Sequence, residues 1–444
     1  MPSGAAFSAT MISIWRAGTP YALAGRRTGG MLVDTVVRVL LFACLAVFGS
    51  RTARAEPARA ITFDEAIGLA ARSPEASGAA ERLAARRRGD RRIGRWAGTT
   101  QATFMPGGIV SPPSSRGFEM QANATHTWSP VRTAARTRSA ARAERATLGA
   151  RARAEALRER IEAARLWIEL FAVERQRRLL DERVAVAQAR VRATVAAVEH
   201  GVARRIDADL ARAEHAALAS EALELEGRQA EIVRRLAEAI GRPERLDLVA
   251  SGPLPAPNLP PDSTLRGMLR EVDALPEVAA SRIAVTAARA RRAEARARTM
   301  PQLVAGAQVE RSAADDWTLY GIVGVQFAGT TSRGRTDATY EEAIAAATND
   351  LERVRVAARA EIERILHDLD HARRTLTLVE DHLLPAATDL RARLERAVAR
   401  GEETIHPLLD ARMREIEART AHIRARADLA WASVRAWLLL QEMR

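Results

Sequence analysis

The sequence has one cysteine, no lysine and few aromatic side chains. Phe, Trp and Tyr together make up 4% of the 444 residues, which is low for the core of a globular enzyme. All 68 basic residues are arginines, and they are interleaved with 55 acidic residues rather than gathered in one basic block. Because nucleic-acid binding needs such a basic surface, this distribution argues against a nucleic-acid partner. We attribute the absence of lysine to coding bias.

Residues 1–55 have the pattern of a secretory signal peptide. An apolar run at 36–48 follows two adjacent arginines and ends shortly before a small-x-small cleavage site at 53–55. The run is too short to cross a membrane comfortably as a helix. We therefore expect export and cleavage, with the mature chain beginning at Glu56.

The single cysteine, Cys44, leaves one alternative open for this leader. Its context, Leu41-Phe42-Ala43-Cys44, resembles a lipoprotein box, but the apolar run continues past it. Cleavage after residue 55 would remove the cysteine, so the exported protein would have no disulfides. The start codon is open as well, because Met31 would give a shorter leader.

Residues 131–240 contain no proline and have the spacing of a coiled coil. Apolar residues recur in steps of four and three, which is narrower than the stripe of a globular helix. An unbroken helix over 131–200 would be on the order of 100 Å long, more than a compact domain needs. Gly201 suits a sharp turn, so we expect a helical hairpin at 131–241 with its tip near 201. The first apolar positions are Leu157, Ile161, Ala164, Ile168 and Phe171.

The hydrophobic period changes to two at residues 118–128. Eleven residues with alternating faces have the length of a membrane-crossing strand. The expected partner is 99–105, across the Gly/Pro/Ser-rich connector 106–116, which gives a β-hairpin at about 99–128. On period alone, a hairpin of a soluble domain is an equally good interpretation. One face holds Phe118, Met120, Ala122, Ala124, His126 and Trp128, and the other holds Glu119, Gln121, Asn123, Thr125 and Thr127.

This order of elements is predicted to occur twice. A helix, the β-hairpin and the long helical hairpin form a first repeat at 56–242. A proline-rich linker covers 243–262, and a second repeat covers 263–444. We interpret the chain as one structural unit written twice.

The second repeat follows the plan of the first. It has a helix, a β-hairpin at about 301–328 and a long helical hairpin at 335–442. The tip of that hairpin is expected near Gly401, which follows Gly201 by 200 residues. Pro385 should disturb the long helix, because proline removes a backbone hydrogen bond.

The predicted fold class is mainly α with membrane β strands. Long coiled-coil hairpins would form an α-barrel, and two β-hairpins per subunit would contribute to a β-barrel. Four strands cannot close around a polar interior, and lipid does not tolerate an open sheet edge, so several copies must pool their strands. The polar strand faces would line water, and Trp128, Trp317 and Tyr320 would lie at the membrane interfaces.

In this order of elements the chain resembles the TolC-type outer-membrane efflux proteins. The resemblance covers about 61–443, and no single motif carries it alone. Where that family usually has a proline after the second strand pair, this chain has Phe327-Ala328-Gly329. The matching motifs are Leu275-Pro276-Glu277, Met300-Pro301-Gln302-Leu303, Leu384-Pro385-Ala386 and Gly401 followed by Leu408-Leu409-Asp410-Ala411-Arg412.

The resemblance implies a homotrimer with a twelve-strand barrel in the outer membrane of a Gram-negative bacterium. A helical tunnel would cross the periplasm and dock on a periplasmic adaptor (membrane fusion) protein and an inner-membrane pump. The implied function is passive export of small molecules, drugs or metal ions in a tripartite efflux or type I secretion system. The alternatives are a periplasmic coiled-coil adaptor, which usually has one hairpin flanked by small β domains, and a soluble structural coiled coil.

The hairpin tips are the candidate functional sites. In a trimer each tip residue becomes part of a ring, and rings of charge select ions. The resemblance places Asp410 at an inward-facing position, and Gly201 and Gly401 mark the ends that would dock the adaptor. The alternative is a solvated turn with helix-terminal charges. The candidate gate and ion-selectivity residues are Asp410, Glu402, Glu403, Arg204 and Arg205.

The sequence offers no enzyme signature, and we predict no catalytic residue, metal site or cofactor. His367 and His371 stand four residues apart on a predicted helix, a spacing that suits a metal pair. They lack the glutamate of a zincin motif and a third ligand nearby. A solvated helix face is therefore the better interpretation.

Overall fold

The structure is a computed structural model that describes residues 59–90, 98–111, 115–128, 131–268, 271–311, 317–327 and 330–443. The predicted leader, with Cys44 and the cleavage site, lies outside these residues. All described elements belong to one compact unit, Ala58–Arg444. Within this part of the chain, no helix is both long enough and apolar enough to span a bilayer.

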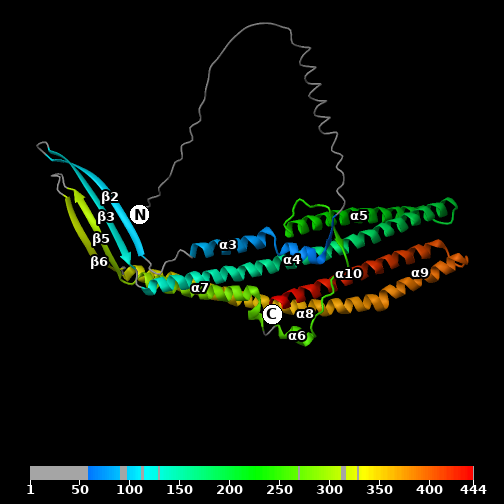
Figure 1. Cartoon of the computed structure of the whole chain (residues 1–444). Helices are drawn as coiled ribbons and strands as arrows, with labels where there is room; N and C mark the ends of the chain where they lie inside the picture. Colours follow the sequence, from blue (N-terminus) through cyan, green and yellow to red (C-terminus); the bar gives the residue numbers. More distant parts are fainter. Residues whose placement is uncertain are drawn as a thin grey trace, which may run out of the picture. The chain divides into compact units, whose positions relative to one another are not determined.

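Four antiparallel strands form one sheet in the order β2-β3-β5-β6 (Figure 1). The two hairpins are therefore neighbours, although more than 170 residues separate them along the chain. Strands β2 and β6 are the edges. The strands are β2 (Gly98–Ser111), β3 (Ser115–Trp128), β5 (Gln302–Arg311) and β6 (Trp317–Gln326).

Strand β2 is longer than the sequence predicted. The connector expected at 106–116 is wrong in part, because β2 continues through Pro106 and two glycines and pairs with β3 as far as Ser111. Proline lacks an N–H group and is tolerated on an edge strand, which is where β2 lies in this subunit. Composition alone therefore placed the turn too early.

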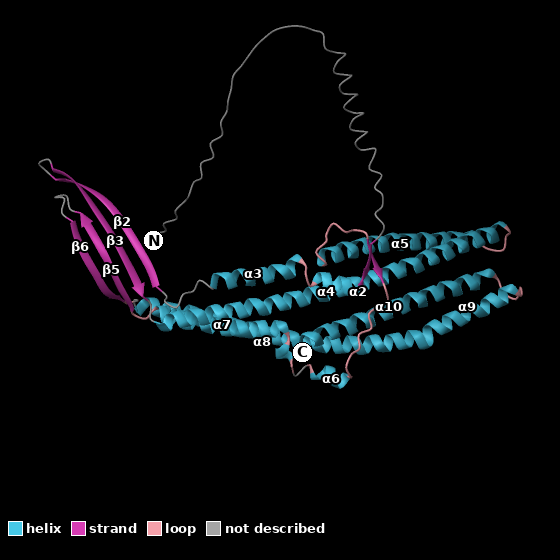
Figure 2. Ribbon diagram, viewed as in Figure 1, coloured by secondary structure: helices cyan, strands magenta, loops and turns pink. Residues whose placement is uncertain are grey.

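Two long helical hairpins fill most of the molecule (Figure 2). The first consists of α4 (Val131–Glu199) and α5 (Arg205–Ala239). The second consists of α8 (Thr330–Leu378), a short π-helix, α9 (Leu384–Ala399) and α10 (Ile405–Met443). Both turns use a glycine in the left-handed region, Gly201 with φ 71° and Gly401 with φ 74°. A side chain would be strained there, so glycine fixes both turning points.

Shorter helices complete the helical layer. Helix α3 (Pro74–Asp90) packs on α4, and α7 (Pro276–Arg298) packs between α4 and α8. The hydroxyl of Thr133 donates to the carbonyl of Ala297 at 3.1 Å, which joins the start of α4 to the end of α7. Helix α10 contacts α4, α8 and α9, so the two hairpins lie against each other.

The π-helix at Val379–Leu383 interrupts the second long helix directly before Leu384 and Pro385. The backbone N–H of Leu384 bonds to the carbonyl of Val379, five residues earlier. A proline ring in a regular helix would collide with the carbonyl four residues before it. The widened turn relieves this conflict. It is the form taken by the disturbance that we expected at Pro385.

A small mixed layer packs against the middle of α4. It contains β1 (Arg59–Thr62), which pairs in parallel with β4 (Leu248–Ser251). It also contains α2 (Phe63–Ala70). Helix α6 (Asp262–Gly267) lies elsewhere, with Asp262 3.0 Å from Arg373 of α8, and a 3₁₀ turn at Val272–Ala274 contacts α7 and α8. The sequence predicted only a helix before the first β-hairpin, and the strand at Arg59–Thr62 was not expected. Strands of four residues carry too little periodicity to be recognised.

Trp167 of α4 anchors this layer. Its side chain is fully buried, and its Nε1 donates to the carbonyl of Ile61 in β1 at 2.9 Å. The ring of Phe63 meets it edge-on, with centroids 5.5 Å apart. Two turns further, the carboxylate of Glu174 accepts from the backbone N–H of Ala250 in β4. Burial raises the pKa of Glu174.

Candidate functional site

The sheet has one apolar face whose rows run across all four strands. The register places Ala102, Ala124, Ala307 and Gly321 in one row, and the rows on either side are mostly apolar as well. One polar contact interrupts this face, between the hydroxyl of Thr100 and Nδ1 of His126 at 2.7 Å. The exposed apolar side chains here include Phe104, Leu303, Trp317, Leu319, Val323 and Val325.

Two tryptophans lie at opposite ends of the apolar face. Trp128 shares its row with Leu303 and Val325, and Trp317 shares its row with Met120 and Arg311. On β3 these rows are eight residues apart, which corresponds to about 27 Å at 3.4 Å per residue. An apolar band of about 25 Å between aromatic girdles is what an outer-membrane barrel presents to lipid.

The opposite face of the sheet is polar. One row contains Thr103, Asn123, Gln308 and Tyr320, and the next pairs Gln121 with Glu310. Tyr320 was expected near a strand end with the interfacial aromatics, but the register puts it on this polar face. Alternate positions separate a mainly apolar face from a more polar one on all four strands, so the sheet is suited to contact water on one side and lipid on the other. The apolar exceptions on the polar face include Met105, Val304 and Ile322.

At the first tip, Arg204 bonds within its own hairpin. Its backbone N–H donates to Asp207 at 3.0 Å, and its Nη2 lies 3.2 Å from the same carboxylate. These bonds cap the start of α5 and lower the pKa of Asp207. Arg205 has no ion pair in the described part of the chain.

At the second tip, Glu402 pairs with Arg400 at 2.6 Å, and this side-chain bond lowers the pKa of Glu402. Glu403 makes no ion pair within residues 330–443 or the other described ranges. Thus, within one subunit, neither Glu402 nor Glu403 pairs with Arg204 or Arg205.

Asp410 is the tip residue that links the two hairpins. Its Oδ1 lies 3.0 Å from Nη1 of Arg190 on α4, and the same nitrogen lies 3.1 Å from Glu214 on α5. One heptad earlier on α4, Arg183 repeats the arrangement with Glu417 on α10 at 2.8 Å and Glu221 on α5 at 3.8 Å. Two arginines seven residues apart thus join α4 to both neighbouring helices.

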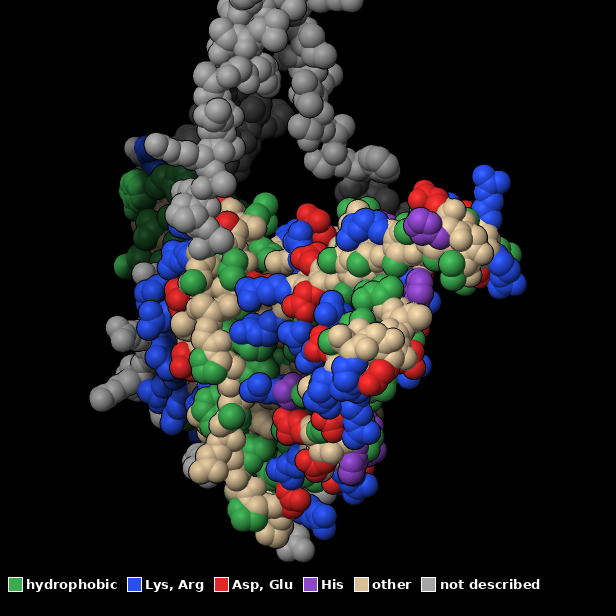
Figure 3. Space-filling view, turned by 90° about the vertical axis from the view of Figure 1, so that its right-hand side faces the viewer, with side chains coloured by type: hydrophobic (Ala, Val, Ile, Leu, Met, Phe, Trp, Pro, Cys, Tyr) green, Lys and Arg blue, Asp and Glu red, His purple; other side chains and the backbone are tan. Residues whose placement is uncertain are grey.

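Sequence reasoning missed Arg183 and Arg190. They precede Gly201 by eighteen and eleven residues, and their role depends on α4 lying beside α10, which no local pattern encodes. The seven-residue step between them is a signal of the coiled coil, not of its partner. Figure 3 shows arginine and acidic side chains interspersed over the face that carries the hairpin ends.

The histidine pair lies on α8. The rings of His367 and His371 are 6.2 Å apart and tilted by 31°. Over the described ranges of the chain, no three His, Cys, Asp or Glu side chains are grouped as a metal site would require.

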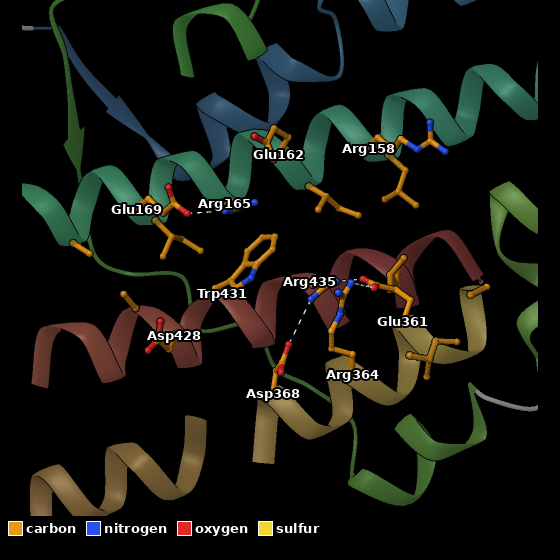
Figure 4. Close-up of a pocket in the computed structure, with 18 of the residues that line it drawn as sticks. Arg158, Glu162, Arg165, Glu169, Glu361, Arg364, Asp368, Asp428, Trp431 and Arg435 are labelled. Atoms are coloured by element: carbon orange, nitrogen blue, oxygen red, sulfur yellow. Dashed lines mark hydrogen bonds and ion pairs between the residues drawn. The ribbon is translucent and has the colours of Figure 1, made fainter. Parts of the chain in front are cut away.

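A cavity of about 1080 Å³ lies between α4, α8 and α10 (Figure 4). Trp431 of α10 projects into it, and Arg435 bonds to Glu361 and lies 3.6 Å from Asp368. Burial raises the pKa of Asp428, against the opposing effect of nearby Arg424 and His371. Among its described lining residues there is no serine, threonine or cysteine, so these walls offer no hydroxyl or thiol nucleophile.

A four-stranded two-faced sheet joined to two long helical hairpins is the subunit fold of TolC-type outer-membrane channels, and the predicted mainly helical chain with two β-hairpins is confirmed. The structure is similar to the outer membrane protein VceC of Vibrio cholerae, with a TM-score of 0.67 and 15% identity over 86% of this chain and 95% of that one. It is similar to the CmeC outer membrane channel of Campylobacter jejuni, with a TM-score of 0.69 and 14% identity over 86% and 85%.

A membrane protein of Pseudomonas aeruginosa gives a TM-score of 0.68 and 14% identity over 85% of this chain and 90% of that one. No protein-family model matches the sequence, and no curated protein matches it. At these identities, the likeness is one of fold.

Proposed function

We propose that this chain is the subunit of a passive outer-membrane export duct with no catalysis of its own. The observation that carries the proposal is the two-faced sheet, with its apolar face bounded by tryptophans about 27 Å apart. The solved structures that share the fold include two described as an outer membrane protein and an outer membrane channel. Neither an adaptor nor a soluble coiled coil would place the apolar face of such a sheet against lipid.

The proposed assembly is a homotrimer whose three sheets form a twelve-strand barrel in the outer membrane of a Gram-negative bacterium. Support comes from the free edges of β2 and β6, which lipid would not tolerate unless neighbouring copies cover them. The twofold sequence repeat, 56–242 and 263–444, would give the barrel and the tunnel an approximate sixfold arrangement.

Fractionation and sizing test this assembly. We expect a heat-modifiable trimer in the outer-membrane fraction. A monomer in the soluble fraction would contradict the duct.

The proposed partners are a periplasmic adaptor and an inner-membrane pump, reached through the tips at Gly201 and Gly401. The cargo would be small molecules, drugs or metal ions, in an efflux or type I secretion system. The equivalent glycine turns of the two hairpins support a common docking end, since both helices after the tip begin four residues beyond the glycine.

Residues 1–55 are proposed to be a cleaved signal peptide. Mass spectrometry of the purified protein should therefore show a mature chain that begins at Glu56. A lipid-modified N-terminus at Cys44 would contradict this and would add an acyl anchor.

Asp410 is proposed to restrain the narrow end of the duct and to favour cations there. Exposed ion pairs contribute about 0–1 kcal/mol each, so a threefold set would hold a closed state by a few kcal/mol, which a docking partner could offset. In planar bilayers, Asp410→Ala should raise the conductance and lower the preference for cations.

Two comparisons separate the roles at the tips. Arg190→Ala removes the same ion pair but keeps the carboxylate, so conductance should rise while cation preference is retained. Arg204→Ala/Arg205→Ala tests the arginines of the first tip, and Glu402 and Glu403 would be tested in the same way. Unchanged conductance and ion preference in the Asp410 and Arg204/Arg205 variants would contradict the gate. The tip residues would then be ordinary charged side chains of solvated turns.

A further inference from the structure

A second cavity, of about 480 Å³, lies between α3, α4 and the start of α7. Among the residues the structure describes, four arginines line it, Arg87 from α3 and Arg142, Arg145 and Arg153 from α4. Glu442 is the one carboxylate in the same described lining. Leu83, Ala150 and Ile283 are among its apolar wall residues.

Three of these four arginines have no carboxylate partner among the described residues. Glu442 already accepts a bond from Arg160 at 2.8 Å. Arg145 lies 3.1 Å from Asp90. Arg87, Arg142 and Arg153 make no ion pair with the residues that the structure describes. The side chain of Arg142 donates to the backbone carbonyl of Arg138 at 3.4 Å. The neighbouring Arg86, by contrast, pairs with Glu144.

The arginines line two walls of an elongated space. Arg142 and Arg153 are eleven residues apart on α4, which corresponds to about 16 Å along the helix. Helix α3 runs antiparallel to α4, with Arg82 at 3.3 Å from Glu155 and Arg86 bonded to Glu144. Arg87 therefore faces the stretch of α4 between the other two arginines. Guanidinium groups spread over this length match a ligand with several anionic groups better than a single small ion.

We propose that this cavity binds a small soluble polyanion that carries phosphate groups, with Arg87, Arg142 and Arg153 as its main contacts. The site goes beyond the proposed export function and does not depend on it. Arg142 lies about 16 Å, and Arg153 about 33 Å, from the start of α4 beside the sheet. That distance favours a soluble phosphate compound over a lipid headgroup at the edge of the sheet.

Calorimetry on the purified full-length protein tests the site, with tripolyphosphate and orthophosphate as probes at one fixed ionic strength. We expect saturable binding of one tripolyphosphate per subunit and at least about tenfold weaker binding of orthophosphate. Arg142→Gln and Arg153→Gln should each weaken tripolyphosphate binding about tenfold, because each removes a charge-assisted contact. These side chains are exposed, and circular dichroism checks that the variants keep their helical content.

Arg151→Gln is the matched control. It is an exposed arginine of α4, outside the described lining of the cavity, and the change removes the same charge. Tripolyphosphate binding to this variant should stay within about twofold of the wild type, since residues two apart on a helix do not face the same side and Arg151 points away from the cavity wall that holds Arg153. Absence of saturable binding, or an equal loss in Arg151→Gln, would overturn the proposal. Vesicles containing phosphatidylglycerol provide the last arm. If they compete with tripolyphosphate, and their own binding is lost in Arg142→Gln, the site belongs to lipid headgroups and a soluble ligand is excluded.

Discussion

Arginine at Ala124 is expected to reduce the amount of assembled trimer strongly, whereas arginine at the next residue, Thr125, is expected to leave it unchanged. Ala124 lies on the apolar face, midway between the row of Trp317 and the row of Trp128. In a membrane this is the middle of the bilayer, where an arginine facing lipid costs about 2–4 kcal/mol. The measurement is the yield of heat-modifiable trimer in outer-membrane fractions.

Thr125 is the matched position because it is on the same strand and the opposite face. Its neighbour across β5 is Gly306, which has no side chain and leaves room for a longer group. Val323 and Gln308 form a second pair, with Val323→Arg expected to impair assembly and Gln308→Arg to be tolerated. Equal trimer yields in all four variants would show that the two faces do not meet different solvents.

Replacing Trp167 with alanine is expected to lower the free energy of unfolding by about 3–5 kcal/mol, the range for removing a large buried aromatic side chain. The loss combines an unfilled cavity with the loss of the hydrogen bond that the indole N–H donates to the carbonyl of Ile61. The expected result is a lower denaturant midpoint. Unfolding of the detergent-solubilised protein is monitored by circular dichroism.

Trp167→Phe separates packing from hydrogen bonding. An aromatic ring remains, so the loss should fall to about 0.5–1.5 kcal/mol, the net contribution of one hydrogen bond. Trp317→Ala is the control for tryptophan content, because that side chain is 58% exposed and lies in the sheet. An effect of Trp317→Ala as large as that of Trp167→Ala would refute the assignment of Trp167 as the anchor of the mixed layer.

The elements with long, uniform periods could be predicted from sequence. The step of four and three along α4 and the alternation in β3 are each repeated often enough to decide between helix and strand. Gly201 and Gly401 could be placed as turns because each interrupts such a pattern. The strand faces followed directly, since a period of two assigns every residue to a side.

What could not be predicted depends on contacts between distant segments. The pairing of β1 with β4 joins strands of four residues that are far apart in sequence, and neither has a pattern of its own. The partner of Asp410 was missed for the same reason, because Arg190 lies on another hairpin. The extension of β2 through Pro106 was missed because edge position, which makes the proline tolerable, is a property of the whole sheet.

The π-helix at Val379–Leu383 affects the rotational phase of the second long helix. A π turn takes up one residue more than an α turn, and one residue corresponds to a rotation of about 100° about the helix axis. The extra residue therefore sets the azimuthal phase of everything between this turn and the tip. Deleting one residue from Val379–Leu383 would restore a regular helix and leave the same side of α9 on α10. A regular α turn through all the present residues would instead rotate that side by about 100°. The number of residues in this turn, more than their composition, therefore determines which side chains face the neighbouring helix.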